Sequence, residues 1–498
     1  MSGAFSGDGR TVGGSGYAQE GVVVAGVAAV VGSGPNGLAA AVHLARSGLE
    51  VRVFEAASVP GGSVRSVPLF GQGSVVDVGA AAHPFGVSSP FFRGCGLDKH
   101  GLRWLHAPVP LAHPLVGRPA VVLQRSLGQT ADELGRDGVA WRRLLGPSVR
   151  GWDQVVESFL GPVVRVPRHP VTMAGFGVRG LWPATLLGRS LFSGVQARAL
   201  FAGSAAHAFV PLSRACTSAF GVVLSAAGHA VGWPVAEGGS GAITAALVAE
   251  LESLGGQVVT GCQVVDVRQV GDADVVMLDV GPWDAVRLVG ERMPSRVRRA
   301  LLRWRYGAAA YKVDYLLDGP VPWADSRVSG AGTVHVGGTM EEIAWAEGQV
   351  AAGRVPQRPF VVVCQQGVAD GLRAPEGRQV VYAYAHVPSG ADGPDVGQLI
   401  DAQIGRFAPG FRDRVVARVE SGPSALSAAN LNVVGGDIVG GAASGLQTVF
   451  RSRVTLRPYE VGVPGVYLCS SSTPPGGGVH GMCGFYAAEA ALRDLRRR

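Results

Sequence analysis

The stretch Val30-Val31-Gly32-Ser33-Gly34-Pro35-Asn36-Gly37 follows an apolar run and precedes Ala39-Ala40-Ala41. This order predicts a buried strand that turns through a glycine loop into a helix. Gly32 would make the tight turn, Gly34 would let a phosphate approach the backbone, and Gly37 would let the helix lie close to the strand. Because N–H groups at a helix N-terminus attract anions, the segment indicates a bound pyrophosphate.

A second apolar strand, Val51-Arg52-Val53-Phe54, comes after this helix and ends in Glu55. A carboxylate about 20 residues beyond the glycines is where a ribose hydroxyl needs an acceptor. The glycine triplet alone is a weak signal, but its place between two strands and before Glu55 makes it strong. We therefore expect a dinucleotide cofactor.

Two further glycine segments bear on which dinucleotide is bound. Gly61-Gly62-Ser63-Val64-Arg65 follows Glu55 and suits a ligand that extends across the sheet, although it can also be an ordinary loop with a surface arginine. Near the other end, Gly465–Ser470 reads as a buried strand and runs into a glycine loop over residues 471–484. A helix from Tyr486 to Leu495 follows. This second strand, loop and helix would hold the middle of a long cofactor.

These segments give the chain a resemblance to the phytoene (carotenoid) desaturase-like family of FAD flavoproteins, and within it to pyridine nucleotide-disulfide oxidoreductase domain-containing protein 2 and its bacterial relatives. The resemblance rests on Gly32–Arg65, Pro474–Ala488, Asn432–Ile438, Trp304–Gly307 and Lys312–Tyr315. It therefore covers about residues 25 to 498, and it is looser between residues 105 and 230. Cys469-Ser470-Ser471-Ser472 departs from the family by placing hydroxyls where many relatives have a glycine and an acidic or small residue.

The resemblance implies an α/β protein whose discontinuous Rossmann-like FAD-binding domain contains an inserted α+β substrate domain, with a mostly antiparallel sheet and apolar helices. Strand patterns at Gln257–Thr260, Val264–Val267 and Val275–Leu278 fit a return to the cofactor domain. The expected divisions are residues 1–24 as a disordered leader, 25–105 as the first FAD-binding part, 106–234 as a helical substrate region, 235–295 as the second FAD-binding part, 296–455 as the substrate sheet and 456–498 as the third FAD-binding part.

The cofactor contacts that we predict come from the glycine loops and from the family pattern, which places the Val264 backbone beside the adenine unless that residue is only core. They are Gly32, Ser33, Gly34, Pro35, Asn36, Gly37, Glu55, Ala56, Gly62, Ser63, Arg65, Val264, Ser472, Val479, His480 and Gly481. Catalytic side chains are not identified, because a flavin itself performs the difficult chemistry. His480 would either polarise the flavin or only bond the backbone, and His83 is a weaker candidate for the same cavity.

Composition limits the other functions. The net charge is +7, nearly all of it from arginine, and no basic stripe with interleaved aromatics indicates nucleic acid. The six cysteines include no C-x-x-C pair, so neither a redox disulfide nor a zinc site is expected, and dispersed thiols fit a reducing cytoplasm. No segment has the ~20 apolar residues that a membrane span requires. We expect a cytoplasmic protein without metal, and the sequence leaves its oligomeric state open.

The substrate is the remaining question. Residues 140 to 230 look helical and apolar, and Phe176–Phe209 combines Trp182 with nearby arginines. These helices either form a lipid-facing entrance with peripheral membrane contact or pack against the core. The leading interpretation is a desaturase or dehydrogenase that transfers a hydride from a small apolar, polyene- or lipid-like substrate to flavin N5. An amine-oxidase-type flavoenzyme and a flavin-binding protein with an interaction or regulatory role are the alternatives.

Overall fold

A parallel sheet carries the glycine loop. The computed structural model describes residues 25–162, 167–393 and 395–497, so the predicted leader at residues 1–24 lies outside the described part. Five strands pair in parallel in the order β16-β10-β1-β2-β9. Their bounds are β1 Val27–Val31, β2 Glu50–Phe54, β9 Gln257–Val259, β10 Val275–Leu278 and β16 Val466–Leu468. Three segments far apart in sequence thus build one sheet, as expected for a discontinuous Rossmann-like fold.

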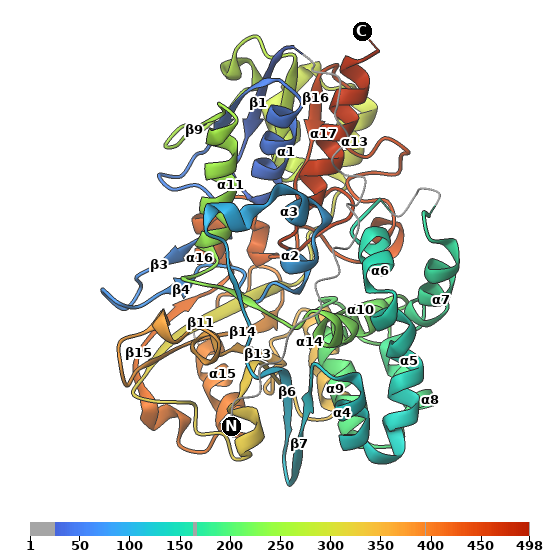
Figure 1. Cartoon of the computed structure of the whole chain (residues 1–498), viewed down its shortest axis with the longest axis vertical. Coiled ribbons are helices and arrows are strands. Elements are labelled where there is room, and N and C mark those ends of the chain that lie inside the picture. The colour runs from blue at the N-terminus through green and yellow to red at the C-terminus, as the bar shows by residue number, and fades with distance from the viewer. Residues whose placement is uncertain (1–24, 163–166, 394, 498) are drawn as a thin grey trace, which may run out of the picture.

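Helix α1 (Pro35–Arg46) begins immediately after the glycine loop and is buried along most of its length. It packs between α11 (Gly241–Ser253) and α17 (Met482–Leu495), beside β1 in the upper lobe of Figure 1. A Cβ on Gly484 would lie 1.8 Å from the carbonyl oxygen of Asn36, so only glycine allows α17 to approach α1 this closely.

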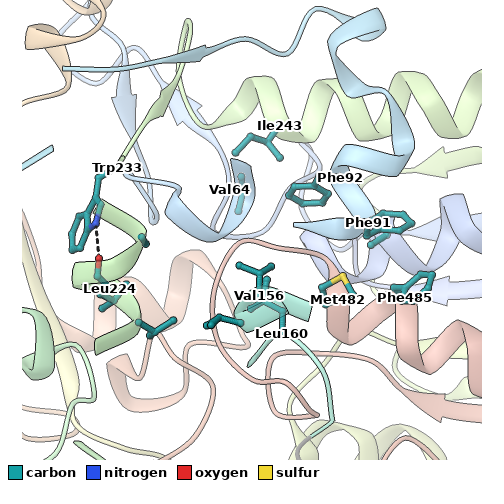
Figure 2. Packing of buried hydrophobic residues seen from close by; sticks show 14 of the residues in the cluster. Val64, Phe91, Phe92, Val156, Leu160, Leu224, Trp233, Ile243, Met482 and Phe485 are labelled. Carbon is teal, nitrogen blue, oxygen red and sulfur yellow. Dashed lines mark hydrogen bonds between the residues drawn. The ribbon is translucent and has the colours of Figure 1, made fainter. Parts of the chain in front are cut away.

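The core beneath these helices joins the N-terminal and C-terminal segments. Figure 2 shows Phe91 and Phe92 close to Met482 and Phe485, with Ile243 above them. Phe91 and Phe92 belong to α3 (Pro90–Cys95), and their rings also pack on one another. Burial of several large apolar side chains, each contributing roughly 1.5–3 kcal/mol, fixes the two ends of the chain together.

A seven-stranded sheet forms the lower left of Figure 1, in the order β15-β11-β14-β13-β12-β6-β7. Only β6 and β12 pair in parallel, so the predicted, mostly antiparallel sheet is confirmed. Helix α15 (Val396–Gly405) packs against this sheet over an apolar core of its own. The strand bounds are β6 Val109–Leu115, β7 Arg118–Leu123, β11 Ala309–Leu317, β12 Ala331–Val336, β13 Val361–Cys364, β14 Gln379–Val387 and β15 Val415–Ser421.

Helices predicted between residues 140 and 230 are present and lie at the lower right of Figure 1. Our expectation that residues 106–234 are helical overlooked one feature: β6 and β7 form a hairpin that extends the seven-stranded sheet. The helices here are α4 Leu127–Glu133, α5 Gly138–Arg150, α6 Trp152–Phe159, α7 Pro170–Gly180, α8 Ala184–Leu191, α9 Val195–Ala206 and α10 Thr217–Ala230.

Shorter elements complete the described chain. They are the strand pairs β3 Ser66–Val67 with β4 Val76–Asp77 and β5 Trp104–Leu105 with β8 Val235–Ala236, and the helices α2 Pro84–Ser88, α12 Pro282–Val289, α13 Ser295–Leu302, α14 Met340–Ala351 and α16 Pro423–Ala429. Among the described residues, no helix combines the length and the apolarity needed to cross a membrane.

The strand predicted at Val264–Val267 is wrong. This segment is a loop that leads into a short 3₁₀ helix at Val267–Val270. The side chain of Asp266 caps that helix by accepting a hydrogen bond from the Arg268 N–H, and Gln269 bonds back to the Asp266 backbone. In a capping box, side chains form hydrogen bonds with backbone N–H groups that, in a strand, would pair with a neighbouring strand. These local hydrogen bonds favour the 3₁₀ helix over the strand that the apolar pattern predicts.

Candidate functional site

The glycine loop between β1 and α1 has no room for side chains at three positions. A Cβ on Gly34 would lie 2.5 Å from Oδ2 of Asp279, and a Cβ on Gly37 would lie 2.2 Å from the carbonyl oxygen of Gly32. Gly32 itself has a φ of 98°, which favours glycine. Gly34, the N-cap residue of α1, has no side chain to cap the helix, Pro35 has no N–H, and the Gly37 N–H donates to Asp279. The Asn36 N–H is therefore the donor at the helix start that has no partner among the described residues and is available to an anion.

Glu55, at the end of β2, is held beside this loop. Its Oε2 accepts hydrogen bonds from the Ser33 backbone N–H at 2.9 Å and from the Ser33 hydroxyl at 2.5 Å, while its Oε1 accepts one from the Ala57 N–H at 2.9 Å. A carboxylate offers about four acceptor positions, so Glu55 keeps lone pairs for further donors such as ribose hydroxyls. Glu55 and Ala56 both line the cavity described below.

The second glycine turn is tied to a distant loop. The Arg65 guanidinium donates to the carbonyl oxygens of Gly62 at 2.7 Å and Ala429 at 3.1 Å. The Asn430 side-chain amide donates to the Ser63 hydroxyl at 2.8 Å. Arg65 is therefore a bridging group between two loops, in addition to lining the cavity.

Asp279, at the end of β10, is a site residue that the sequence analysis missed. Its Oδ2 accepts the Gly37 N–H at 2.9 Å, and burial raises the pKa of Asp279 to about 7. The Asn432 side chain donates to the Asp279 carbonyl oxygen at 2.8 Å and accepts the Gly281 N–H at 3.1 Å. The segment around Asn432, which contributed to the family resemblance, thus braces the strand behind the glycine loop.

The C-terminal glycine loop places only some of its predicted residues at the cavity. Val479 and His480 line it, whereas Ser472 and Gly481 are not among the lining residues. The hydroxyl of Ser472 bonds to that of Ser470 at 2.7 Å, and a Cβ on Gly481 would lie 2.8 Å from the Cβ of Ala39. In the structure, Gly481 therefore serves the close packing of α17 on α1.

His480 is fully buried in this loop. Its Nδ1 accepts the Met482 backbone N–H at 3.0 Å, and burial lowers the pKa of His480 to about 4. His83 also lines the cavity, with Nε2 2.8 Å from the Ser240 hydroxyl and its pKa lowered to about 4 by burial. Both rings are therefore neutral near pH 7, and neither is a strong base.

A cavity of about 1050 Å³ connects all these segments. A dinucleotide fits its polar end, where the glycine cradle would be filled by any Cβ and where Oδ1 of Asn36 is buried without a partner among the described residues. The predicted contacts that line the cavity are Gly32, Ser33, Gly34, Pro35, Asn36, Glu55, Ala56, Gly62, Ser63, Arg65, Val264, Val479 and His480. Gly37 lies behind the loop.

The same cavity continues into an apolar part, the chamber, which lies between the seven-stranded sheet, helices α6, α7 and α10, and the segment that follows α9. Its walls are mainly aromatic and aliphatic side chains, and the sheet contributes Lys312 as a buried cation. The principal chamber residues are Phe159, Met173, Phe176, His207, Phe209, Phe220, Leu224, Trp233, Ala310, Lys312, Thr333, Val362, Cys364, Tyr382 and Tyr384.

The charge of Lys312 is paired with a carboxylate of the protein itself. Its Nζ donates to Oδ2 of Asp314 at 2.6 Å and to the Asp77 carbonyl oxygen at 2.9 Å, and it lies 4.6 Å from the centre of the Tyr382 ring. The Asp77 carboxylate, in turn, accepts from Arg373 at 2.9 Å. This chain of buried charges joins the β3–β4 hairpin to the seven-stranded sheet and holds the part of the chamber wall that contains Lys312.

Sequence reasoning had no signal for these long-range partners. Arg451, which also lines the cavity, donates to the carbonyl oxygens of Gly440 at 3.2 Å and Ser471 at 2.9 Å. In the part of the chain that the structure describes, no group of three histidine, cysteine or acidic side chains is arranged to hold a metal ion.

Comparisons with known proteins agree with this geometry. The family described as NAD(P)-binding Rossmann-like domain matches residues 30–95, which contain the glycine loop and Glu55. The chain is similar to hydroxyneurosporene desaturase of Cereibacter sphaeroides, at 27% identity over 94% of this chain and 98% of the relative. It is also similar to pyridine nucleotide-disulfide oxidoreductase domain-containing protein 2 of Rattus norvegicus, at 24% identity over 94% of each chain.

Among solved structures, a putrescine oxidase bound to putrescine has the same fold, with a TM-score of 0.60 at 16% identity over 95% of this chain and 100% of the other. The full-length coverage of these matches extends the likeness well beyond the glycine loop. The sheet order, the glycine cradle and the relatives lead to one assignment. The chain is a flavin-dependent oxidoreductase that is similar to phytoene desaturase-like enzymes.

Proposed function

We propose that the flavin cofactor is FAD and that the enzyme removes hydride from a C–H bond of an apolar substrate held in the chamber. One observation carries this proposal: residues of the glycine loop and residues of the chamber line the same cavity. A dinucleotide can therefore reach from the N-terminus of α1 toward a substrate that lies between the sheet and the helices, and it meets no wall of protein on the way.

The roles of the cofactor-binding residues follow from their positions. The Asn36 N–H and the positive end of the α1 dipole would hold the pyrophosphate, and Glu55 would accept hydrogen bonds from ribose hydroxyls. The loop at Val264 borders the same end of the cavity and would contact the adenine through its backbone. The buried loops that carry Arg65 and His480 would enclose the ring system.

A bound flavin would accept the hydride at N5. The protein's own contribution is to position the substrate and to exclude water. Phe209 and Tyr384 stack with ring centres 6.3 Å apart and planes 7° from parallel, and Tyr382 stands across Tyr384 at 78°. Such walls orient an apolar or conjugated chain by contact and dispersion, and they leave few polar groups to hydrate it.

The test is anaerobic reduction of the purified holoprotein by a panel of apolar substrates with activated C–H bonds, polyenes and unsaturated lipids included. We expect at least one class to bleach the flavin absorption and to yield a product two hydrogens lighter. Flavin that stays oxidised with every member would favour the third interpretation, a flavin-binding protein with an interaction or regulatory role.

An amine substrate is the second candidate, because Tyr382 and Tyr384 form an aromatic pair at the chamber wall. An ammonium group, however, needs a carboxylate or an open aromatic face. The Tyr382 ring already faces Lys312. None of the carboxylates that line the cavity comes from the seven-stranded sheet or from α6 to α10; they are Glu55, Asp279, Asp284 and Asp437. Hydrogen peroxide released over a panel of amines would establish this candidate in place of the first.

We also propose that helix α7 and the segment after it contact a membrane surface. One side of α7 lines the chamber through Met173 and Phe176, while its other side exposes Val178, and Trp182 follows the helix as an exposed residue that does not line the cavity. An apolar substrate dissolved in lipid could enter beside such a surface without crossing water. The unpaired state of all six cysteines supports the cytoplasmic side.

Flotation with vesicles that contain anionic lipid tests this contact. We expect the wild-type protein to float with the vesicles and the double variant Val178→Ser, Trp182→Ser to lose most of that binding. The matched control is Val416→Ser, an exposed valine on strand β15 at the other end of the seven-stranded sheet. Equal flotation of all three proteins would refute the proposal.

A further inference from the structure

Four histidines gather at one end of the chamber, outside the residues that we assign to the cofactor. They are His113 on β6, His335 on β12, His386 on β14 and His207, which follows α9. Strand register places the three strand histidines on one face of the sheet. Val334 is opposite Ala112, so His335 lies next to His113, and His335 aligns through Val362 with Tyr384, which shares a face with His386. Only His207 is among the residues that line the cavity.

The cluster is linked by hydrogen bonds. Nε2 of His207 lies 2.9 Å from Nε2 of His335, Nε2 of His113 lies 2.7 Å from the Gly338 carbonyl oxygen, and Nδ1 of His386 lies 2.8 Å from the Glu347 carboxylate. The rings of Trp233 and Phe360 pack against His335, with centres 5.6 and 5.5 Å away. Among the described residues, these side chains form no group that can hold a metal ion. The cluster is therefore held together by its hydrogen bonds and ring contacts.

Burial keeps the rings of His113, His207 and His335 neutral near pH 7. It lowers the pKa of His207 to about 3 and that of His113 to about 4, and it lowers the pKa of His335 strongly. A neutral imidazole carries one proton, so one ring nitrogen donates and the other accepts. In the contact between His207 and His335, one ring must therefore be the donor and the other the acceptor.

The position of the proton follows from the partners. Nδ1 of His335 is buried without a hydrogen-bond partner among the described residues. An unpaired N–H in that place would cost more free energy than an unpaired lone pair, because buried N–H groups are almost always satisfied. His335 therefore carries its proton on Nε2 and donates it to Nε2 of His207. His207 must then carry its own proton on Nδ1.

The Nδ1–H group of His207 makes no hydrogen bond with any described residue, and His207 lines the chamber. The neighbouring indole of Trp233 is not a competing donor, since its N–H already donates to the Leu224 carbonyl oxygen at 3.2 Å (Figure 2). A free N–H in an otherwise apolar chamber is costly unless a ligand supplies an acceptor.

We propose that His207, held by His335, is a subsite for an oxygen acceptor, and that the substrate is a largely apolar molecule with a hydroxyl or carbonyl group at one end. This inference rests on the proposed function and names the substrate class more closely. The oxygen would accept the hydrogen bond from Nδ1–H of His207, and this contact would fix the position of the apolar chain along the chamber. His207 thus helps to bind and position the substrate; it does not remove the proton or hydride.

The test compares ligands of equal length on the flavin-loaded protein: octan-2-one and 1-octanol against 1-octene, each titrated while the flavin absorption spectrum is recorded. For the wild type, we expect the ketone and the alcohol to bind roughly three- to tenfold more tightly than the alkene, the value of one hydrogen bond. His207→Phe should abolish this preference, so that the ketone, the alcohol and the alkene bind with dissociation constants within about twofold of one another. His207→Asn, which keeps an N–H donor near the Nδ1 position, should retain part of it.

His106→Phe is the matched control, because it makes the same substitution at a histidine that does not line the cavity. It should retain the wild-type preference. An oxygen preference that survives in His207→Phe, or no preference in the wild type, would overturn the subsite. Binding of 1-octene to the yellow protein in the same titrations would leave the proposed function standing, so the two failures are distinguishable.

Discussion

The two ends of the cavity are built in different ways. At the cofactor end, the site is formed mainly by backbone: glycines without Cβ and the N–H at the start of α1. One side chain, the Glu55 carboxylate after β2, completes it. At the chamber, side chains from separate strands and helices form the walls, and buried charges such as those of Lys312 and Arg373 hold them in place. The first kind of site leaves a continuous motif in the sequence, whereas the second kind leaves scattered residues.

The sharpest way to break the cofactor end is Gly37→Ala. Its new Cβ would lie 2.2 Å from the Gly32 carbonyl oxygen, and backbone cannot move aside cheaply. We expect a protein that purifies with less than about a tenth of the wild-type flavin and is destabilised by several kcal/mol, as overpacking predicts. Gly405→Ala, whose Cβ would meet nothing within 4 Å, should keep full flavin content. Normal flavin content in Gly37→Ala would show that the loop is not the cradle.

The chamber end should fail instead through its buried charges. Arg373→Leu leaves the carboxylates of Asp77 and Asp370 without their cation, and breaking a buried pair costs about 3–5 kcal/mol. We expect a large fall in the urea midpoint of unfolding. Arg327→Ala, at the exposed pair with Asp325, should cost less than about 1 kcal/mol. Equal losses in the two variants would mean that the buried network does not support the chamber.

Glu55→Gln separates binding from folding at the cofactor end. Both carboxylate oxygens of Glu55 accept backbone N–H groups, so the glutamine side chain would point its NH₂ at one of these donors and lose that hydrogen bond. Its uncharged oxygen is also a weaker acceptor for ribose hydroxyls. FAD affinity should fall by about 10- to 100-fold, while the fold survives. Glu50→Gln, at an exposed glutamate on the same strand, should leave the FAD dissociation constant unchanged. Calorimetric titration of the apoprotein with FAD measures both.

The smallest expected effect concerns Asp279. Its folded pKa of about 7 exceeds its ordinary value, so between about pH 4 and pH 7 the folded state binds more protons than the unfolded state. Apoprotein stability contributed by this group is therefore fully present below about pH 4 and is lost progressively as pH rises to about 7. Asp279→Asn should unfold at a higher temperature than the wild type at pH 8, and the difference should shrink as pH falls to 5.

Thermal unfolding of the apoprotein from pH 5 to pH 8.5 measures that difference. Asp272→Asn, at an exposed aspartate in the loop before β10, should leave the wild-type profile unchanged. A loss of stability in Asp279→Asn at pH 8 would contradict the account, because it would mean that the charged carboxylate stabilises the glycine loop.

The same contrast explains what the sequence could predict. The first glycine loop, Glu55 and the strand at Val275–Leu278 have local patterns, and the structure places them as expected. The strand predicted at Val264–Val267 failed because a capping box formed there. Asp279 and His207 carried no local signal, since their partners lie far along the chain: Gly37 is 242 residues from Asp279, and His335 is 128 residues from His207.

Glycine motifs also carry two meanings that sequence alone does not separate. Gly34 faces the cavity, whereas Gly481 allows α17 to pack against Ala39 on α1. Both belong to loops at helix N-termini, and both were predicted to bind the cofactor. Only the three-dimensional positions distinguish a glycine that admits a ligand from one that admits a neighbouring helix.

The most direct measurement of the central claim is the absorption spectrum of the purified protein, with mass identification of the compound that heat releases from it. The account predicts a yellow protein that releases FAD in about equimolar amount. A colourless protein that also fails to take up added FAD would contradict it, and the cavity between the glycine loop and the chamber would then need another occupant.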